Sequence, residues 1–315
     1  MKKTLRVVAL VAVLGIVAAA CANNKAGSSV PTGSSSVPPT GIQPGGTLKM
    51  AMLGDVSAAF DPQKEYYGVT WEYYRCCLLR TMMSYSGATT SEGGTDIHPD
   101  LAAADPEVSA DGLTWTFSIK QGIMYAPPKG DVEVTAGDFV RAIERTANPK
   151  ANVGGYSFYY STIEGFDDFA SGDAASISGI AATDDYTLEV HLTEPAGDLG
   201  YRFAMPTTAP IAPDEDGERL GVAEGHDKDY GRFLVGTGPY MFEGADALDF
   251  SVPAKDQNPT AGYIPGRSIV LVRNPSWSAD TDELRPAYAD GIQVTIGGDN
   301  DDLYNQIQAD RKSVV

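Results

Sequence analysis

The sequence predicts a mixed α/β fold, because segments with the two-residue period of strands alternate with segments that have helical spacing. Residues 113–119 place an apolar side chain at every second position, which indicates a half-buried strand. The tetrapeptide Thr135-Ala136-Gly137-Asp138 matches a capping box and predicts the start of a helix. About 270 residues follow Thr47 with evenly spread aromatic and aliphatic side chains, enough for a sizeable core and two sub-domains.

The remaining elements are predicted from the same two periods. Asp111-Gly112 is typical of a turn, and it joins Val108 to the strand at 113–119 as a hairpin. Pro195 opens the next turn or helix after a second alternating strand. The further predicted strands are 47–53, 186–192, 267–273 and 292–296, and the further predicted helices are 71–85 and 299–310, the last with acidic residues in its first turn.

The N-terminus predicts export and a lipid anchor. Three basic residues among the first six precede an apolar run of 14 residues, 7–20, which is shorter than the ~20 that span a bilayer. Small residues and then Cys21 end the run, and this arrangement resembles a bacterial lipobox, in which the cysteine is acylated; Ala18 departs from the usual Leu or Val. The alternative is an ordinary signal peptide with an incidental cysteine. Residues 21–46 are rich in Gly, Ser and Pro and predict a disordered linker.

The net charge restricts the partners of the protein, and the cysteines bear on its redox chemistry. A formal net charge of −19 argues against nucleic acid and anionic lipid surfaces as binding partners. Besides Cys21, the chain contains only the adjacent Cys76 and Cys77, in an apolar helical stretch. Neighbouring cysteines can form only a strained bridge, so we interpret this pair as small buried residues, with a redox role as the alternative.

A search for catalytic and metal-binding motifs finds none with the required spacing. The chain has no Ser-x-x-Lys, Gly-x-Ser-x-Gly or His-Glu-x-x-His pattern, and its three histidines are far apart. Asp214, Asp216 and Gly217 resemble part of a calcium loop, but Ala212 and Ala223 occupy two ligand positions. We therefore expect no cofactor and no metal, and His191 is predicted on the polar face of its strand. Carboxylates that meet only in the fold leave a hydrolase open as the alternative.

A series of short motifs resembles one family. In chain order they are Gly45-Gly46-Thr47-Leu48, Phe60-Asp61-Pro62, Pro99-Asp100-Leu101-Ala102, Ser109 to Phe117 with Lys120-Gln121-Gly122, Thr135 to Phe139, Ile177-Ser178-Gly179-Ile180, Gly236-Thr237-Gly238-Pro239-Tyr240 and Leu271-Val272-Arg273-Asn274-Pro275. The series resembles the family 5 extracellular solute-binding proteins, the oligopeptide, dipeptide and nickel receptors of ABC importers. Asp105-Pro106 and the longer segment 126–134 depart from the family pattern.

The resemblance implies a periplasmic-binding-protein-like type II clamp, in which two lobes close around a ligand. It divides the chain into a signal peptide (1–20), the lipidated linker (21–46), lobe one (47–285) and a hinge strand with the start of lobe two (286–315). Most of the second lobe is then missing, and we hypothesise a truncated or frame-shifted product that binds ligand poorly.

The same resemblance implies a monomeric receptor, not an enzyme, on the outer face of the membrane. It would capture peptides or similar small solutes and deliver them to ABC permease subunits. Nickel or another metal chelate and oligosaccharides are the alternative ligands within this class.

The resemblance also implies eight ligand-contacting residues. Asp55, Val56 and Ser57 follow the first strand in a loop that faces the cleft in the family. Tyr156, Phe158 and Tyr159 belong to an aromatic cluster after the helix that starts at Thr135, and Pro206 and Thr207 resemble a cleft-lining stretch. The alternative for the tyrosines is packing in the core, where Trp71 and Tyr74 are also expected.

Overall fold

The computed structural model describes residues 43–57, 60–148, 151, 155–213, 230–252, 261–309 and 313–314 of the chain. The predicted signal peptide, Cys21, almost all of the linker, and Asp214, Asp216 and Gly217 lie outside the described residues. Within the described residues, no helix is long and apolar enough to cross a membrane.

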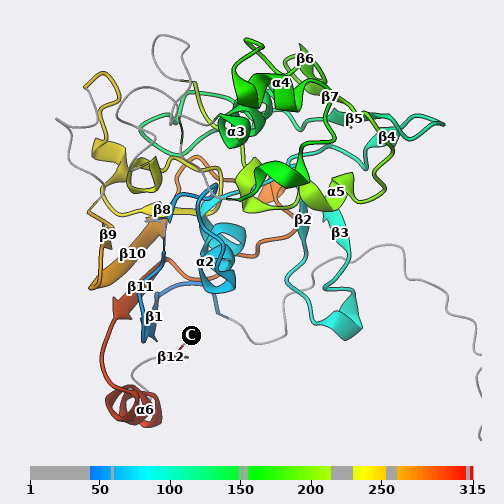
Figure 1. Cartoon of the computed structure of the whole chain (residues 1–315). Helices are drawn as coiled ribbons and strands as arrows, with labels where there is room; N and C mark the ends of the chain where they lie inside the picture. The colour runs from blue at the N-terminus through cyan, green and yellow to red at the C-terminus, as the bar shows by residue number, and fades with distance from the viewer. Residues whose placement is uncertain are drawn as a thin grey trace, which may run out of the picture. The chain divides into compact units, whose positions relative to one another are not determined.

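A six-stranded mixed sheet joins the beginning of the described chain to its end. The strand order is β12 (Ser313–Val314), β1 (Thr47–Met52), β11 (Gly291–Ile296), β10 (Ser268–Arg273) and β8 (Tyr240–Phe242), with β9 (Tyr263–Ile264) paired to β10 (Figure 1). β1 and β11 are parallel, with Thr47 opposite Gly291, and β10 is antiparallel to β11. The strands predicted at 47–53, 267–273 and 292–296 are confirmed within one residue at each end.

A second, four-stranded sheet has the order β4 (Glu107–Val108), β5 (Thr114–Ser118), β7 (Thr187–His191) and β6 (Ile180–Asp184). β4 and β5 form the predicted hairpin. Trp115 and Phe117 are buried on one face of β5, and Leu188 and Val190 on β7, as the alternation predicts. The helix α3 (Ala136–Ala147) packs along β6 and β7 and begins with the predicted capping box.

The helix predicted over 71–85 is wrong beyond Leu78. The chain forms α2 (Gly68–Tyr73) and then a π-helical turn, η2 (Tyr74–Leu78). It becomes extended at Leu79 and enters β2 (Met83–Tyr85), which pairs with β3 (Ile97–Pro99). Every side chain from Leu79 to Met82 is buried. An extended strand inside the core can bury consecutive side chains to both sides, whereas a surface helix buries only one stripe.

The prediction that both adjacent cysteines are buried is confirmed for Cys77 and wrong for Cys76. Cys76 and Cys77 are joined by a disulfide bond. Cys77 is buried, but Cys76 is exposed. The reason is the helical spacing: Tyr73, Tyr74 and Cys77 share the buried face, while Cys76 lies four residues after the exposed Glu72 on the opposite face.

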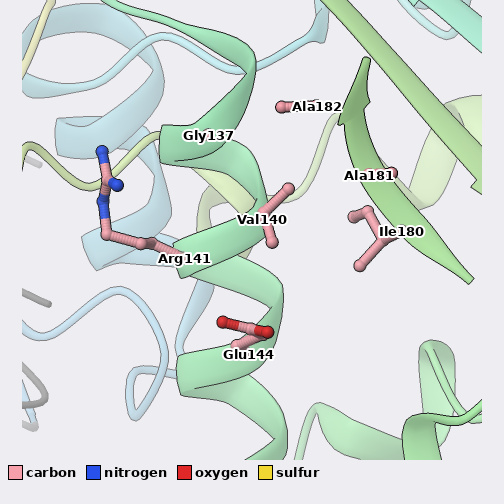
Figure 2. Close-up of a pocket in the computed structure, with 7 residues that line it drawn as sticks. All are labelled: Gly137, Val140, Arg141, Glu144, Ile180, Ala181 and Ala182. Carbon is pink, nitrogen blue, oxygen red and sulfur yellow. The ribbon is translucent and has the colours of Figure 1, made fainter. Parts of the chain in front are cut away.

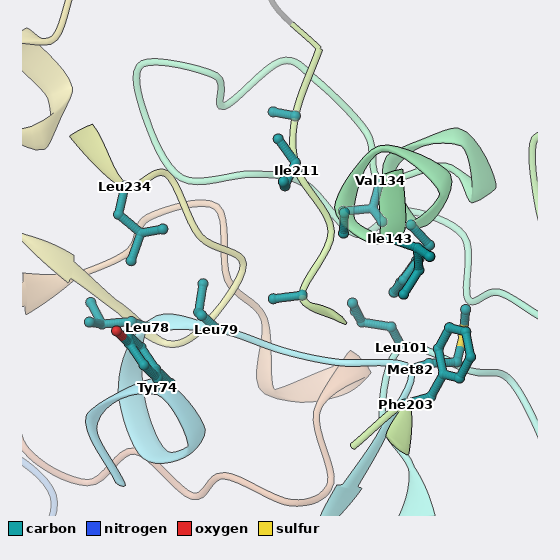
Figure 3. Packing of buried hydrophobic residues seen from close by; sticks show 14 of the residues in the cluster. Tyr74, Leu78, Leu79, Met82, Leu101, Val134, Ile143, Phe203, Ile211 and Leu234 are labelled. Atoms are coloured by element: carbon teal, nitrogen blue, oxygen red, sulfur yellow. The ribbon is translucent and has the colours of Figure 1, made fainter. Parts of the chain in front are cut away.

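The remaining helical elements of the described residues are short, and most of them lie in connections between strands. They are η3 (Thr90–Glu92), η5 (Ser157–Tyr159), α4 (Phe166–Ser171), α5 (Leu199–Arg202), η6 (Pro206–Thr208), η7 (Tyr230–Phe233), η8 (Ala245–Ala247), η10 (Ala279–Thr281) and α6 (Asn300–Gln308). The helix predicted at 299–310 is confirmed as α6. Most of the buried hydrophobic residues form one continuous cluster, part of which, with Leu78, Met82 and Phe203, is shown in Figure 3.

A buried ionic network ties distant segments together next to this core. Asp100 accepts hydrogen bonds from Arg80 Nε at 2.8 Å and Arg285 Nη2 at 2.6 Å, and Asp282 pairs with both arginines. Burial alone would raise the pKa of Asp100, but the guanidinium groups of Arg285 and Arg80 outweigh it and lower this pKa. The Asp100 carboxylate thus stays charged inside the protein, and the network holds residues 80–100 against residues 282–285.

Candidate functional site

A pocket lies where β1 ends. It has a volume of about 480 Å³ and is lined by Met52–Ser57 and by Tyr67, Val69 and Thr70 at the start of α2. The carboxyl ends of the parallel strands β1 and β11 meet here, and the Gly297 amide donates to the Met52 carbonyl. In α/β sheets the carboxyl ends of parallel strands are the usual place for a ligand, and the volume is in the range of small-molecule sites.

Asp55 holds the loop that forms one wall of this pocket. Its Oδ1 accepts from the Val56 amide at 2.8 Å, and its Oδ2 accepts from the Gly266 amide at 2.6 Å and the Tyr263 hydroxyl at 3.2 Å. Burial, together with the negative charge of Asp55, raises the pKa of Tyr263, so this hydroxyl remains a donor. Although Asp55 is exposed, both of its carboxylate oxygens are already hydrogen-bonded.

Glu65 supports both walls of the pocket from beneath. Its side chain is fully buried, and Oε1 accepts from Ser57 Oγ at 2.6 Å and from the amides of Tyr66 and Tyr67, both at 2.9 Å. One carboxylate therefore links the loop after β1 to the residues before α2. Our sequence reasoning missed this residue, since nothing in the sequence distinguishes it from the other acidic residues.

Aromatic rings extend the site beside the pocket. Tyr67 is 68% exposed and Phe158 is 62% exposed. The hydroxyl groups of Tyr66 and Tyr159 are 3.3 Å apart, and the rings of Phe158 and Tyr159 have centroids 3.9 Å apart. We call Tyr66, Tyr67, Phe158 and Tyr159 the aromatic surface. Exposed tyrosines of this kind combine apolar contact with hydrogen bonding and suit a ligand that has both characters.

The structure separates the eight candidate residues into two groups. Asp55, Val56 and Ser57 line the pocket, Phe158 is exposed and Tyr159 is partly buried. The other three, Tyr156, Pro206 and Thr207, are buried, so they support the site from the interior.

The contacts of the buried group show how it supports the site. The Tyr156 hydroxyl donates to the Glu65 carbonyl, and the Thr207 carbonyl accepts from Gln63 Nε2 at 3.0 Å. Asp61 and Gln63 in turn bind the buried guanidinium of Arg145 on α3, with Asp61 Oδ2 2.7 Å from Arg145 Nη2. The segment between β1 and α2 is therefore anchored to α3 and to η6.

A second hollow, of about 360 Å³, lies between α3 and β6 (Figure 2). Val140 points toward β6, whereas Arg141 extends away from the strand. The Arg141 guanidinium pairs with Asp138 and donates to the Ile211 carbonyl at 2.9 Å. The positive charge of Arg141 is thus engaged in holding α3, and we regard this hollow as a weaker candidate for a ligand site than the pocket at β1.

His191 bears on the hydrolase alternative. It lies on the polar face of β7 as predicted, with Nδ1 3.2 Å from Thr114 Oγ1 and Nε2 2.7 Å from Glu189 Oε1. Neither pocket described above includes these residues. The described residues also contain no group of three side chains placed to hold a metal ion.

Comparison with known proteins identifies the family. The model of the bacterial extracellular solute-binding proteins, family 5 (middle part), matches residues 96–312, which is more than half of the chain. The chain belongs to this family. Among solved structures of related proteins, the clavulanic acid biosynthesis oligopeptide binding protein 2 is 27% identical, with a TM-score of 0.68. Listeria monocytogenes OppA bound to peptide is 20% identical, with a TM-score of 0.63, so the chain shares the fold of that protein.

Curated relatives in this family are also similar to the chain. The oligopeptide-binding protein AmiA of Streptococcus pneumoniae is 34% identical over 119 residues, or 36% of this chain and 18% of AmiA. The di/tripeptide-binding protein 4 of Pseudomonas aeruginosa is 27% identical over 181 residues, or 51% of this chain and 32% of that protein. The two solved structures named above match 86% of this chain but only 43% and 46% of their own chains. The chain thus spans less than half of the length of these structures.

Proposed function

We propose that the chain captures peptides or similar small solutes outside the membrane, as the substrate-binding part of an ABC importer. The observation that carries this proposal is the pocket at the end of β1, beside exposed aromatic rings, in a chain of the solute-binding family. The names of the relatives support peptides as the ligand class.

The physical features of the pocket suit capture without covalent chemistry. Its walls combine apolar side chains, Met52, Val56 and Val69, with the hydroxyl groups of Ser57 and Thr70. Such a lining can bind a ligand through shape and a few hydrogen bonds. The internal anchors at Glu65 and Arg145 keep the walls in place before the ligand arrives, which lowers the entropic cost of binding.

We further propose the cellular arrangement that the sequence predicts. Acylated Cys21 would anchor the protein to the outer face of the membrane, and the linker would keep the binding body within reach of the permease, raising its effective concentration there. Residues 47–285 would form one lobe, and residues 286–315 would begin the passage to the second. A Cys21→Ser variant should appear in the soluble fraction, whereas the wild-type chain should stay with the membranes. Equal partition of the two would contradict the anchor.

Calorimetric titration with pools of di- to pentapeptides tests the ligand class. We expect weak peptide binding, because the chain spans less than half of the length of the solved structures it matches. A Tyr67→Ala variant should bind about tenfold more weakly still, since truncating a central aromatic contact costs ~1–2 kcal/mol. Tyr304→Ala is the matched control: Tyr304 is 61% exposed on α6 and does not line the pocket. It should change affinity less than about twofold.

The same titration separates the alternatives. Binding of a nickel chelate or an oligosaccharide, but of no peptide, would replace the ligand class within the receptor function. Equal weakening by Tyr67→Ala and Tyr304→Ala would contradict the pocket as the binding site. Chromatography of the peptides after incubation tests the hydrolase alternative, because a receptor returns its ligand intact.

A further inference from the structure

The disulfide between Cys76 and Cys77 has no part in the binding function proposed above. It lies in the π-helical turn η2, which continues α2, and both cysteines are far in sequence from Cys21. Cys76 is exposed to solvent and Cys77 is buried. One half of the bridge is therefore accessible to a reagent from solution while the other half belongs to the core.

The backbone around the bridge is held by contacts that do not depend on it. The Leu79 amide donates to the Tyr74 carbonyl at 2.9 Å and closes the π turn around both cysteines. The Gly238 amide donates to the Leu78 carbonyl at 3.1 Å, and Arg285 Nε donates to the Arg75 carbonyl at 2.5 Å. These contacts keep the turn in place when the sulfur–sulfur bond is open.

The bridge also contributes little to the stability of the whole fold. A disulfide stabilises mainly by closing a loop of the unfolded chain, and the effect grows with the length of that loop. The loop between neighbouring residues is the shortest possible. A bridge that can be reached from solvent and opened without unfolding the protein has the properties of a reactive site.

We propose that Cys76–Cys77 is a thiol–disulfide exchange site for small thiols. A thiolate attacks the Cys76 sulfur, forms a mixed disulfide with it, and displaces the Cys77 sulfur as a thiolate that takes a proton from solvent. A second thiol then attacks the mixed disulfide, which releases the Cys76 thiol and a disulfide of the two small thiols. Two electrons pass from the small thiols to the protein, and two protons accompany them.

Mass spectrometry of the full-length chain tests the first part of this proposal. Trypsin cuts after Arg75 and Arg80, so both cysteines leave in one short peptide, separate from Cys21. Without reductant, this peptide should resist N-ethylmaleimide even after unfolding; after native protein is treated with dithiothreitol, it should carry two labels. With 2-mercaptoethanol, a single mixed disulfide at Cys76 is expected as the intermediate. Two labels without any reductant would overturn the proposal.

The rate of opening tests accessibility. We expect the native protein to react with 2-mercaptoethanol within about tenfold of the unfolded chain, because accessibility to the attacking thiol controls such rates. Opening only after unfolding would overturn the proposal. Two single variants provide matched controls: in Cys77→Ser the remaining Cys76 should react with maleimide at least about tenfold faster than the remaining Cys77 in Cys76→Ser. Equal rates would contradict attack at Cys76.

Hydrogen exchange shows whether opening stays local. After reduction, the exchange rate of the Leu79 amide should change less than about tenfold, and the amides of the β5–β7 pair should be unchanged, since the contacts of the turn remain. Faster exchange throughout both sheets would mean that the bridge is a structural staple of the whole fold, which would overturn the proposal of an exchange site.

Discussion

Replacing Asp100 with asparagine should strongly destabilise the protein. Asp100 is buried and contacts two buried arginines, at 2.8 Å from Arg80 Nε and 2.6 Å from Arg285 Nη2. Asn keeps the shape of the side chain but removes its charge, so two arginines would share only Asp282. Removing one partner of a buried ion pair costs about 3–5 kcal/mol. A loss of about 4 kcal/mol raises the unfolding constant roughly a thousandfold and lowers the melting temperature by about 10 °C.

Thermal and urea unfolding, followed by circular dichroism, measure this loss. The control is Asp198→Asn, the same chemical change in an ion pair on the surface: Asp198 contacts Arg202 at 2.8 Å, but its side chain is 60% exposed. This control should cost no more than about 1 kcal/mol. The reasoning is refuted if Asp100→Asn and Asp198→Asn lower stability equally, because the buried charge balance would then have no special weight.

Three further predictions follow from the same structure. The pKa of Asp100 is lower in the folded state than its ordinary value of 3.8, so its contribution to stability is complete above about pH 5 and is lost as the pH falls further. The stability difference between wild type and Asp100→Asn, measured by urea unfolding, should therefore shrink between about pH 5 and pH 2. A constant difference would contradict this. Thr135→Ala removes the cap of α3 and should cost about 1 kcal/mol in the same assay, and no loss would argue against the capping box. Gly238→Ala would place a methyl group against the Cys77 carbonyl oxygen and should lower the free energy of unfolding by about 3 kcal/mol. The control is Gly197→Ala, where the added methyl group meets open space, and it should cost less than about 1 kcal/mol. Equal melting temperatures of the two variants would contradict the close contact at Gly238.

Local patterns in the sequence predicted most elements, because each depends on residues close to one another in the chain. The alternation at 113–119 and the capping box at Thr135 correspond to β5 and α3. The segment 71–85 was mispredicted after Leu78, because apolar residues at helical spacing also occur in a buried extended segment. Exposed and buried surroundings, rather than local preference, decide between these two structures.

The candidate site could be predicted only in part. The loop Asp55–Ser57 was found through its resemblance to a family pattern, and it does line the pocket. Glu65 was not found, because it joins two walls of the pocket through a hydrogen bond from Ser57 that forms only in the fold, while it also accepts from the amides of Tyr66 and Tyr67. Likewise, Tyr156 belongs to an aromatic cluster in the sequence, and only its packing shows that it lies beneath the surface.

By itself the sequence determined the mixed α/β class, the positions of most strands, the family resemblance and the absence of the common catalytic motifs. The tertiary structure decided which distant segments meet: β1 beside β11, Asp100 between Arg80 and Arg285, and Cys76 outside the core while Cys77 lies within it. The physical reason is that hydrogen bonding within a helix or turn involves near neighbours, whereas burial and charge pairing also depend on residues that are distant in the chain, such as Asp100 and Arg285.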